Sequence, residues 1–196
     1  SSMSQIKLLH SGGNGVSIVA PDSNPASDRT LKLPSDGDGT ILTTNSSVGK
    51  ILQVVTVLKT DSFSTSVQVN SSADVTGLSV NITPSSASNK IMVFASIDCF
   101  TERTSTYNAL GHLYLIRDTT RISGKTIRTR IDNSLTTNYI HATGPVNFMY
   151  LDSPNTTSQT NYHIEAACYA GNQTVQVNAV SGYDMNSSVT VMEVAA

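Results

Sequence analysis

Apolar and polar residues alternate along most of the chain after residue 49, and this pattern constrains the fold more than any other feature. Turn residues interrupt the alternating runs at about ten-residue intervals, as in antiparallel sandwiches and barrels. We therefore predict about eight to ten strands in residues 49–196, packed as one all-β, antiparallel, jelly-roll-like β-sandwich. The side chains expected to face its core are Val67, Val80, Val93, Ile97, Leu115, Ile164, Val177 and Val191.

The segment from residue 91 to residue 97 departs from simple alternation, because both of its faces are rich in apolar residues. Ile91, Val93, Ala95 and Ile97 alternate with Met92, Phe94 and Ser96. We expect both faces of this strand to be buried.

Small polar residues dominate the composition. The chain has 28 serines, 24 threonines and 15 asparagines, together 67 of its 196 residues. These side chains compete for backbone hydrogen bonds and favour strands, caps and turns, which argues against long helices. Only 13% of the residues are charged and the net charge is −2, so no basic surface for nucleic acid is expected. No apolar run approaches the roughly 20 residues that span a membrane, and no membrane insertion is expected.

Residues 1–48 differ from the rest of the chain, since their apolar stretches are short and are separated by turn sequences. The short apolar stretches are residues 6–9, 16–20, 30–33 and 40–43. Isolated strands of this length cannot bury a core alone. We interpret residues 1–48 as a short-strand shaft or attachment segment that needs neighbouring chains, and residues 49–196 as the C-terminal domain. The pattern of a signal peptide is missing, and Met3 is interpreted as a native start.

Residues that could carry chemistry are scattered. Cys99 and Cys168 lie in apolar runs and are interpreted as buried free thiols, with a single disulfide as the alternative. His112 and His163 fall in strand patterns without metal-ligand spacing, although one histidine near a threefold axis could bind a metal together with its copies. Neither a nucleophile motif nor a carboxylate cluster stands out. We predict a protein without catalytic site, metal or cofactor.

Two groups of residues are candidates for contact with a receptor. Loop tyrosines can stack on sugar rings while the hydroxyl stays in water, and arginines offer bidentate hydrogen bonds to carboxylates of an anionic polysaccharide. The alternative for the arginines is a strand pair with a basic solvent face. The candidate receptor-binding residues are Tyr107, Asn138, Tyr139, Tyr183, Arg121 and Arg128.

Several stretches, taken in order, resemble bacteriophage tail-fibre proteins. Residues 13–21 (GNGVSIVAP), 28–34 (DRTLKLP) and 38–44 (DGTILTT) are similar to a short module repeated in such fibres. Later stretches resemble the C-terminal domain of marine, especially cyanobacterial, phage structural proteins. They are residues 49–55 (GKILQVV), 74–80 (DVTGLSV), 115–118 (LIRD), 151–154 (LDSP) and 191–194 (VMEV).

This resemblance implies a component of the extracellular phage particle that assembles as a parallel homotrimer. The first function to consider is a non-enzymatic virion fibre that recognises a bacterial surface receptor, either a glycan or a protein. The second is a structural virion subunit, such as a head fibre, a decoration protein or a tail connector, that binds only other virion proteins. A polysaccharide depolymerase is a third hypothesis.

Overall fold

The computed structural model describes residues 5–19, 50–103, 109–129, 140–179 and 185–196. The chain divides into a unit of residues 1–46 and a unit of residues 47–196, and each is described by itself. All regular structure in the described ranges is β-strand, as the alternation predicted. Within these ranges no helix is long and apolar enough to cross a membrane.

The described part of the first unit, residues 5–19, is a β-hairpin. Strands β1 (Gln5–Leu9) and β2 (Gly15–Val19) pair antiparallel, with Ile6 opposite Ile18. Their apolar side chains are exposed within this unit, for example Leu8 at 62% and Val16 at 71%. The burial of these side chains between chains stays a prediction. The strands predicted at residues 30–33 and 40–43 lie outside the described residues.

The second unit contains ten strands in the residues that the structure describes. They are β3 (Ile51–Lys59), β4 (Phe63–Thr65), β5 (Ala73–Ile82), β6 (Lys90–Arg103), β7 (Ala109–Arg117), β8 (Thr120–Thr129), β9 (Ile140–Asp152), β10 (Thr160–Cys168), β11 (Gln173–Val177) and β12 (Ser187–Val194).

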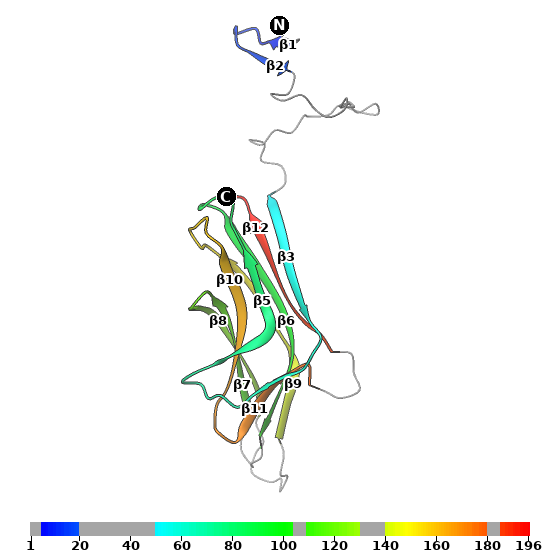
Figure 1. Cartoon of the computed structure of the whole chain (residues 1–196), viewed down its shortest axis with the longest axis vertical. Helices are drawn as coiled ribbons and strands as arrows, with labels where there is room; N and C mark the ends of the chain where they lie inside the picture. Colours follow the sequence, from blue (N-terminus) through cyan, green and yellow to red (C-terminus); the bar gives the residue numbers. More distant parts are fainter. Residues whose placement is uncertain (1–4, 20–49, 104–108, 130–139, 180–184) are drawn as a thin grey trace. The chain divides into compact units, whose positions relative to one another are not determined.

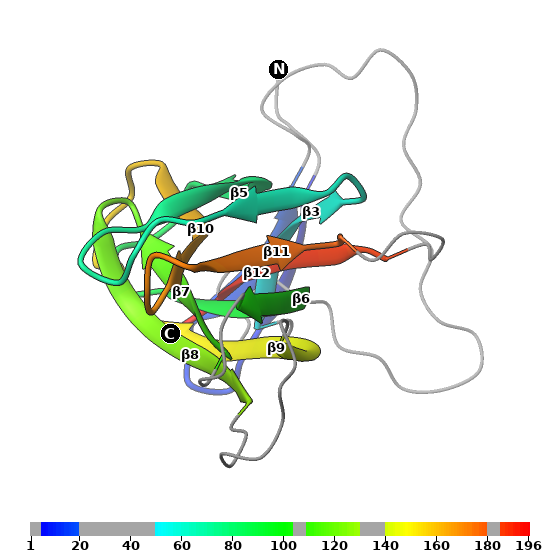
Figure 2. The ribbon, with the colours of Figure 1, turned by 90° about the horizontal axis from the view of Figure 1, so that it is seen from below.

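Eight of these strands form an antiparallel jelly roll (Figure 1). The pairs β3–β12, β5–β10, β6–β9 and β7–β8 are those of one long hairpin rolled onto itself. Rolling places β5, β10, β7 and β8 in one sheet, and β3, β12, β6 and β9 in the other. Figure 2 shows these two layers from below. The predicted antiparallel sandwich is therefore confirmed.

The short strands β4 and β11 extend the second sheet. Strand β9 pairs along β6 from Ile91 to Arg103, while β12 and β11 follow one another along the remaining edge of β6. Hydrogen bonds between polar groups connect the end of β11 to the start of β12. The Asn178 amide donates to the Lys59 carbonyl (2.9 Å), and the Ser187 hydroxyl donates to Asn178 Oδ1 (2.8 Å).

The core lies between the two sheets, and seven of the eight predicted core side chains are buried in it. The exception is Val67, which is half-buried in the segment after β4. Both cysteines are buried free thiols, which confirms the first of the two interpretations.

The expectation for residues 91–97 is wrong for one face. Ile91, Val93 and Ile97 are fully buried, whereas Phe94 on the other face is 39% exposed. A two-layer sandwich buries only the inner face of each sheet, and no further layer of the described unit covers the outer face of β6.

Candidate functional site

A large irregularity in β5 shapes the outer face of the first sheet. His163 of β10 pairs with Ser79, and Glu165 pairs with Asp74. Two residue steps along β10 therefore oppose five along β5. Gly77 allows this detour because it has a φ of +87°, which side-chain-bearing residues rarely adopt. Bulges of this kind re-aim side chains and occur next to functional sites.

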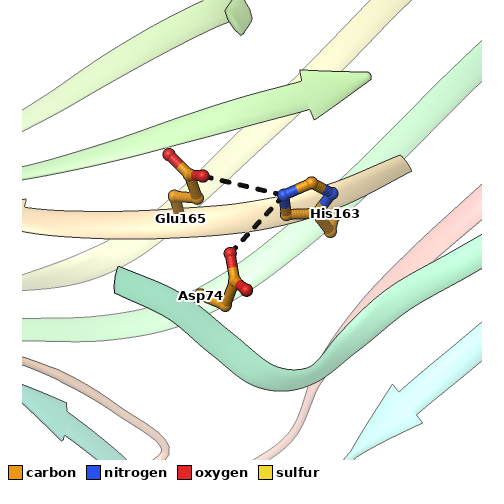
Figure 3. A group of neighbouring side chains, drawn as sticks. All are labelled: Asp74, His163 and Glu165. Carbon is orange, nitrogen blue, oxygen red and sulfur yellow. Dashed lines mark ion pairs between the residues drawn. The ribbon is translucent and has the colours of Figure 1, made fainter. Parts of the chain in front are cut away.

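The detour brings three ionisable side chains together (Figure 3). Nε2 of His163 lies 3.5 Å from Oδ1 of Asp74 and 3.7 Å from Oε1 of Glu165. The three donor atoms lie within 4.8 Å of one another. His163 and Glu165 share a face because they are two residues apart on one strand. We call these three residues the acidic-histidine cluster.

Neighbouring polar groups orient the cluster. The Asn161 amide nitrogen faces the acceptors Asn81 Oδ1 (2.7 Å) and Ser79 Oγ (2.8 Å), so its oxygen is left for Nδ1 of His163 at 2.7 Å. Nδ1 therefore carries the proton, and Nε2 is the nitrogen aimed at the two carboxylates. The Ser72 hydroxyl donates to Oε2 of Glu165, which leaves Oε1 for His163.

An open pocket of about 310 Å³ adjoins the acidic-histidine cluster. It lies beside the detour of β5 and is lined by Asp74, Val75, Thr76, Gly77, Ser79, Asn161 and His163. Most of these groups are hydroxyl, amide, carboxylate or imidazole groups. Such a lining can form hydrogen bonds with a ligand that carries many hydroxyl groups.

Of the sequence-predicted site residues, the structure describes the two arginines. Tyr107, Asn138, Tyr139 and Tyr183 lie outside the described residues. Arg121 and Arg128 are exposed on β8, in agreement with a strand whose solvent face is basic.

Arg121 lies on the same sheet face as the acidic-histidine cluster. In the strand register, His163 of β10 pairs with Ile116 of β7, and Ile116 pairs with Arg121 of β8. The guanidinium carbon of Arg121 is 3.4 Å from the centroid of the Tyr114 ring, a cation–π contact. The Tyr114 ring also stacks on His112, with ring centroids 6.1 Å apart. Burial, followed by the charge of Arg121, lowers the pKa of His112, which favours the neutral imidazole.

Sequence reasoning missed Asp74, Glu165 and their meeting with His163. The His163-x-Glu165 spacing could have indicated that these two residues are neighbours, because it places both side chains on one face of a strand. Asp74 gave no signal, because its position beside His163 depends on the pairing of β5 with β10 and on the detour at Gly77.

Comparisons with known proteins found distant structural similarity only. No protein-family model and no curated protein matches the chain. The chain is similar to a VP2 subviral particle of infectious bursal disease virus at 19% identity and a TM-score of 0.31, covering 94% of this chain and 48% of that chain. The structure of the Gt strain of the same virus gives 17% identity, a TM-score of 0.31 and the same coverage. This chain therefore spans about half the length of these proteins. The fold assignment rests on the strand pairings themselves.

Proposed function

We propose that this chain is a non-enzymatic fibre protein of a phage particle that binds a bacterial surface glycan through its jelly-roll domain. The resemblance of its motifs to tail-fibre proteins supports a place in the virion. The observation that carries the glycan-binding role is the open pocket, with its hydroxyl, amide and carboxylate groups, on the outer face of the sheet β5-β10-β7-β8. The exposed arginines of β8 on the same sheet offer partners for acidic sugars.

The pocket offers hydrogen-bonding groups to a sugar. Thr76 and Ser79 are exposed hydroxyl groups, and Asp74 is an exposed carboxylate. Sugar hydroxyls both donate and accept hydrogen bonds, so this mixture of groups can satisfy them.

The geometry of the carboxylates supports a role without catalysis. Glycoside cleavage needs two carboxyl groups on either side of the scissile bond. In the acidic-histidine cluster, the imidazole of His163 lies within 3.7 Å of both carboxylates and is in contact with each. A sugar would have to displace this ring in order to sit between them.

The test is binding of the full chain to host cells and to an array of bacterial polysaccharides. Thr76→Trp fills the pocket from its rim, and Thr157→Trp places the same change on the exposed segment between β9 and β10, away from the pocket. We expect Thr76→Trp to abolish binding and Thr157→Trp to leave binding unchanged. Equal binding by the native chain and by Thr76→Trp, or a native chain that binds neither cells nor glycans, would refute the proposal.

The outer face of the second sheet favours a second function, that of a structural virion subunit that takes part in assembly. The outer face of the other sheet carries a row of Val54, Met192, Met92 and Leu151, and the next row contains Phe94 and Met149. Met149 is 75% exposed, Val54 54% and Leu151 53%. We call this surface the apolar face. Exposed patches of this kind mark protein contacts.

We propose that the apolar face is a contact between copies of this chain in a homotrimer. The two aligned rows across β3, β12, β6 and β9 contain no charged residue, which lowers the cost of desolvation. Light scattering should give about 62 kDa, three times 20.8 kDa. Met149→Glu should lower the mass, and Asn147→Glu, two residues earlier on the same strand and outside the apolar rows, should lower it less. A stable 20.8 kDa species for the native chain would refute the trimer.

A further inference from the structure

We propose that Asp74, His163 and Glu165 form a zinc-binding site, which is a departure from the absence of metal expected from the sequence. The site supplies one imidazole nitrogen and two carboxylate oxygens from two hydrogen-bonded strands. These donor types are the ones that bind Zn²⁺ in proteins, where three protein ligands leave one position open. Binding of the metal is independent of the proposed glycan-binding function.

The distances of the acidic-histidine cluster are close to those of a tetrahedral site. Zinc–ligand bonds of about 2.0–2.1 Å place the donors of a tetrahedron about 3.3 Å apart. Nε2 of His163 already lies 3.5 Å and 3.7 Å from the two carboxylate oxygens. The two carboxylate oxygens lie within 4.8 Å of each other, which leaves a gap of up to about 1.5 Å to the tetrahedral separation. The Asp74 side chain can close this gap by rotation, because it is 75% exposed.

The hydrogen bonds around the cluster prepare the ligand atoms. Oδ1 of Asn161 accepts a hydrogen bond from Nδ1–H of His163 and so orients Nε2 toward the carboxylates. Metal-binding histidines in proteins use the second nitrogen in this way. Ser72 holds the outer oxygen of Glu165 and leaves the inner oxygen for the metal. Two of the three ligands therefore have an orienting partner outside the cluster.

The charges and the donor types of the cluster suit a divalent cation. Two of the three donor atoms are carboxylate oxygens, and a cation bound among the three would offset their mutual repulsion. Zn²⁺ offsets both carboxylates at once, and imidazole favours zinc over Ca²⁺ and Mg²⁺, which prefer oxygen ligands only. The open side of the site borders the pocket, since Asp74 and His163 line both.

Titration of the full chain with ZnCl₂ by isothermal calorimetry, after removal of metals with a chelator, tests the proposal. We expect one Zn²⁺ per chain, with Ca²⁺ and Mg²⁺ binding at least about tenfold more weakly. Co²⁺, added as a spectroscopic probe, should give the intense visible bands of a four-coordinate site. His163→Gln and Asp74→Asn should each weaken zinc binding by about tenfold or more.

Two histidine controls separate this site from adventitious binding. His10→Gln in the first unit and His112→Gln on β7 remove imidazoles outside the cluster and should leave zinc affinity unchanged. Asp74→Asn keeps the test valid if His163→Gln fails to fold, because the Asp74 side chain is exposed. Zinc binding that survives Asp74→Asn, that is lost in His10→Gln or His112→Gln, or that is undetectable in the native chain would overturn the proposal.

Discussion

Replacement of Glu193 by glutamine should destabilise the jelly-roll unit and remove much of its pH dependence in acid. Glu193 lies near the end of β12 and is 1% exposed. Its Oε1 accepts hydrogen bonds from Ser85 N (2.7 Å), Ser85 Oγ (2.7 Å) and Asn89 Nδ2 (2.6 Å). Its Oε2 accepts one from Gln53 Nε2 (2.6 Å). One carboxylate therefore ties the turn between β5 and β6 to strands β3 and β12.

The size of the effect follows from the pKa. Burial alone would raise the pKa of Glu193, but the hydrogen bonds from Asn89, Gln53 and Ser85 outweigh it and lower the pKa from 4.5 to about 2. A folded-state pKa below the unfolded-state value means that the stabilisation is present above pH 4.5 and is lost as the pH falls toward 2. It amounts to about 3 kcal/mol at pH 7 and to between about 1 and 2 kcal/mol at pH 3.

Glutamine cannot replace this carboxylate, because Gln53 Nε2 donates to both Oε2 of Glu193 (2.6 Å) and the Thr83 carbonyl (2.8 Å). In Glu193→Gln, the oxygen of the new side chain can keep the hydrogen bonds from Ser85 and Asn89. The nitrogen of the new side chain then faces the Gln53 amide nitrogen, and two donors oppose each other. Rotation of Gln53 would place its oxygen against the Thr83 carbonyl. One hydrogen bond of Gln53 is lost in either arrangement, together with the charge that the other donors stabilise, and we expect a loss of about 2–4 kcal/mol at pH 7.

Urea unfolding of the native chain and of Glu193→Gln, measured between pH 7 and pH 3, tests this reasoning. The difference between the two free energies of unfolding should shrink as the pH falls below 4.5. Gln53→Met is the matched control, since it should cost less in the Glu193→Gln background than in the native chain. Two parallel pH profiles, or additive costs for the two substitutions, would refute the assignment of the stability to this carboxylate.

Two further predictions concern buried groups. Tyr162 is fully buried, and its hydroxyl donates a hydrogen bond to Asp152 (2.7 Å), which also accepts hydrogen bonds from Arg117. Tyr162→Phe should therefore lower the free energy of unfolding in urea by about 1–2 kcal/mol. An unchanged free energy of unfolding would contradict the role of this bond. Burial raises the pKa of Cys99 to about 12, with the charge of Asp98 adding to it, and burial also raises the pKa of Cys168. A thiol reagent at neutral pH should therefore modify both cysteines only after unfolding, and rapid labelling of the folded chain would contradict their burial.

The sequence predicted the fold well because alternation is a local property of each strand. Strands β6, β10 and β12 show it clearly, and their inward side chains Val93, Ile164 and Val191 are buried as expected. Alternation does not show whether another layer covers the outer face of a strand. Phe94 and Met92 are apolar, yet nothing in the described unit covers them fully, so the expectation that this face is buried was wrong.

The candidate site was harder to predict, because it depends on register. His163 and Glu165 are close in sequence and could have been paired by their spacing. Asp74 reaches them only because β5 pairs with β10 and makes a detour at Gly77. Neither the pairing partner nor an irregularity of this length follows from local alternation.

The two surfaces proposed as functional belong to different sheets of one sandwich. The pocket and the acidic-histidine cluster lie on the outer face of β5-β10-β7-β8, and the apolar face lies on the outer side of β3, β12, β6 and β9. The outer faces of a two-layer sandwich point in opposite directions. Contacts between copies through the apolar face would therefore leave the pocket open to a ligand. For the same reason, Met149→Glu should change the mass of the assembly without changing its affinity for zinc, and Thr76→Trp should change glycan binding without changing the mass.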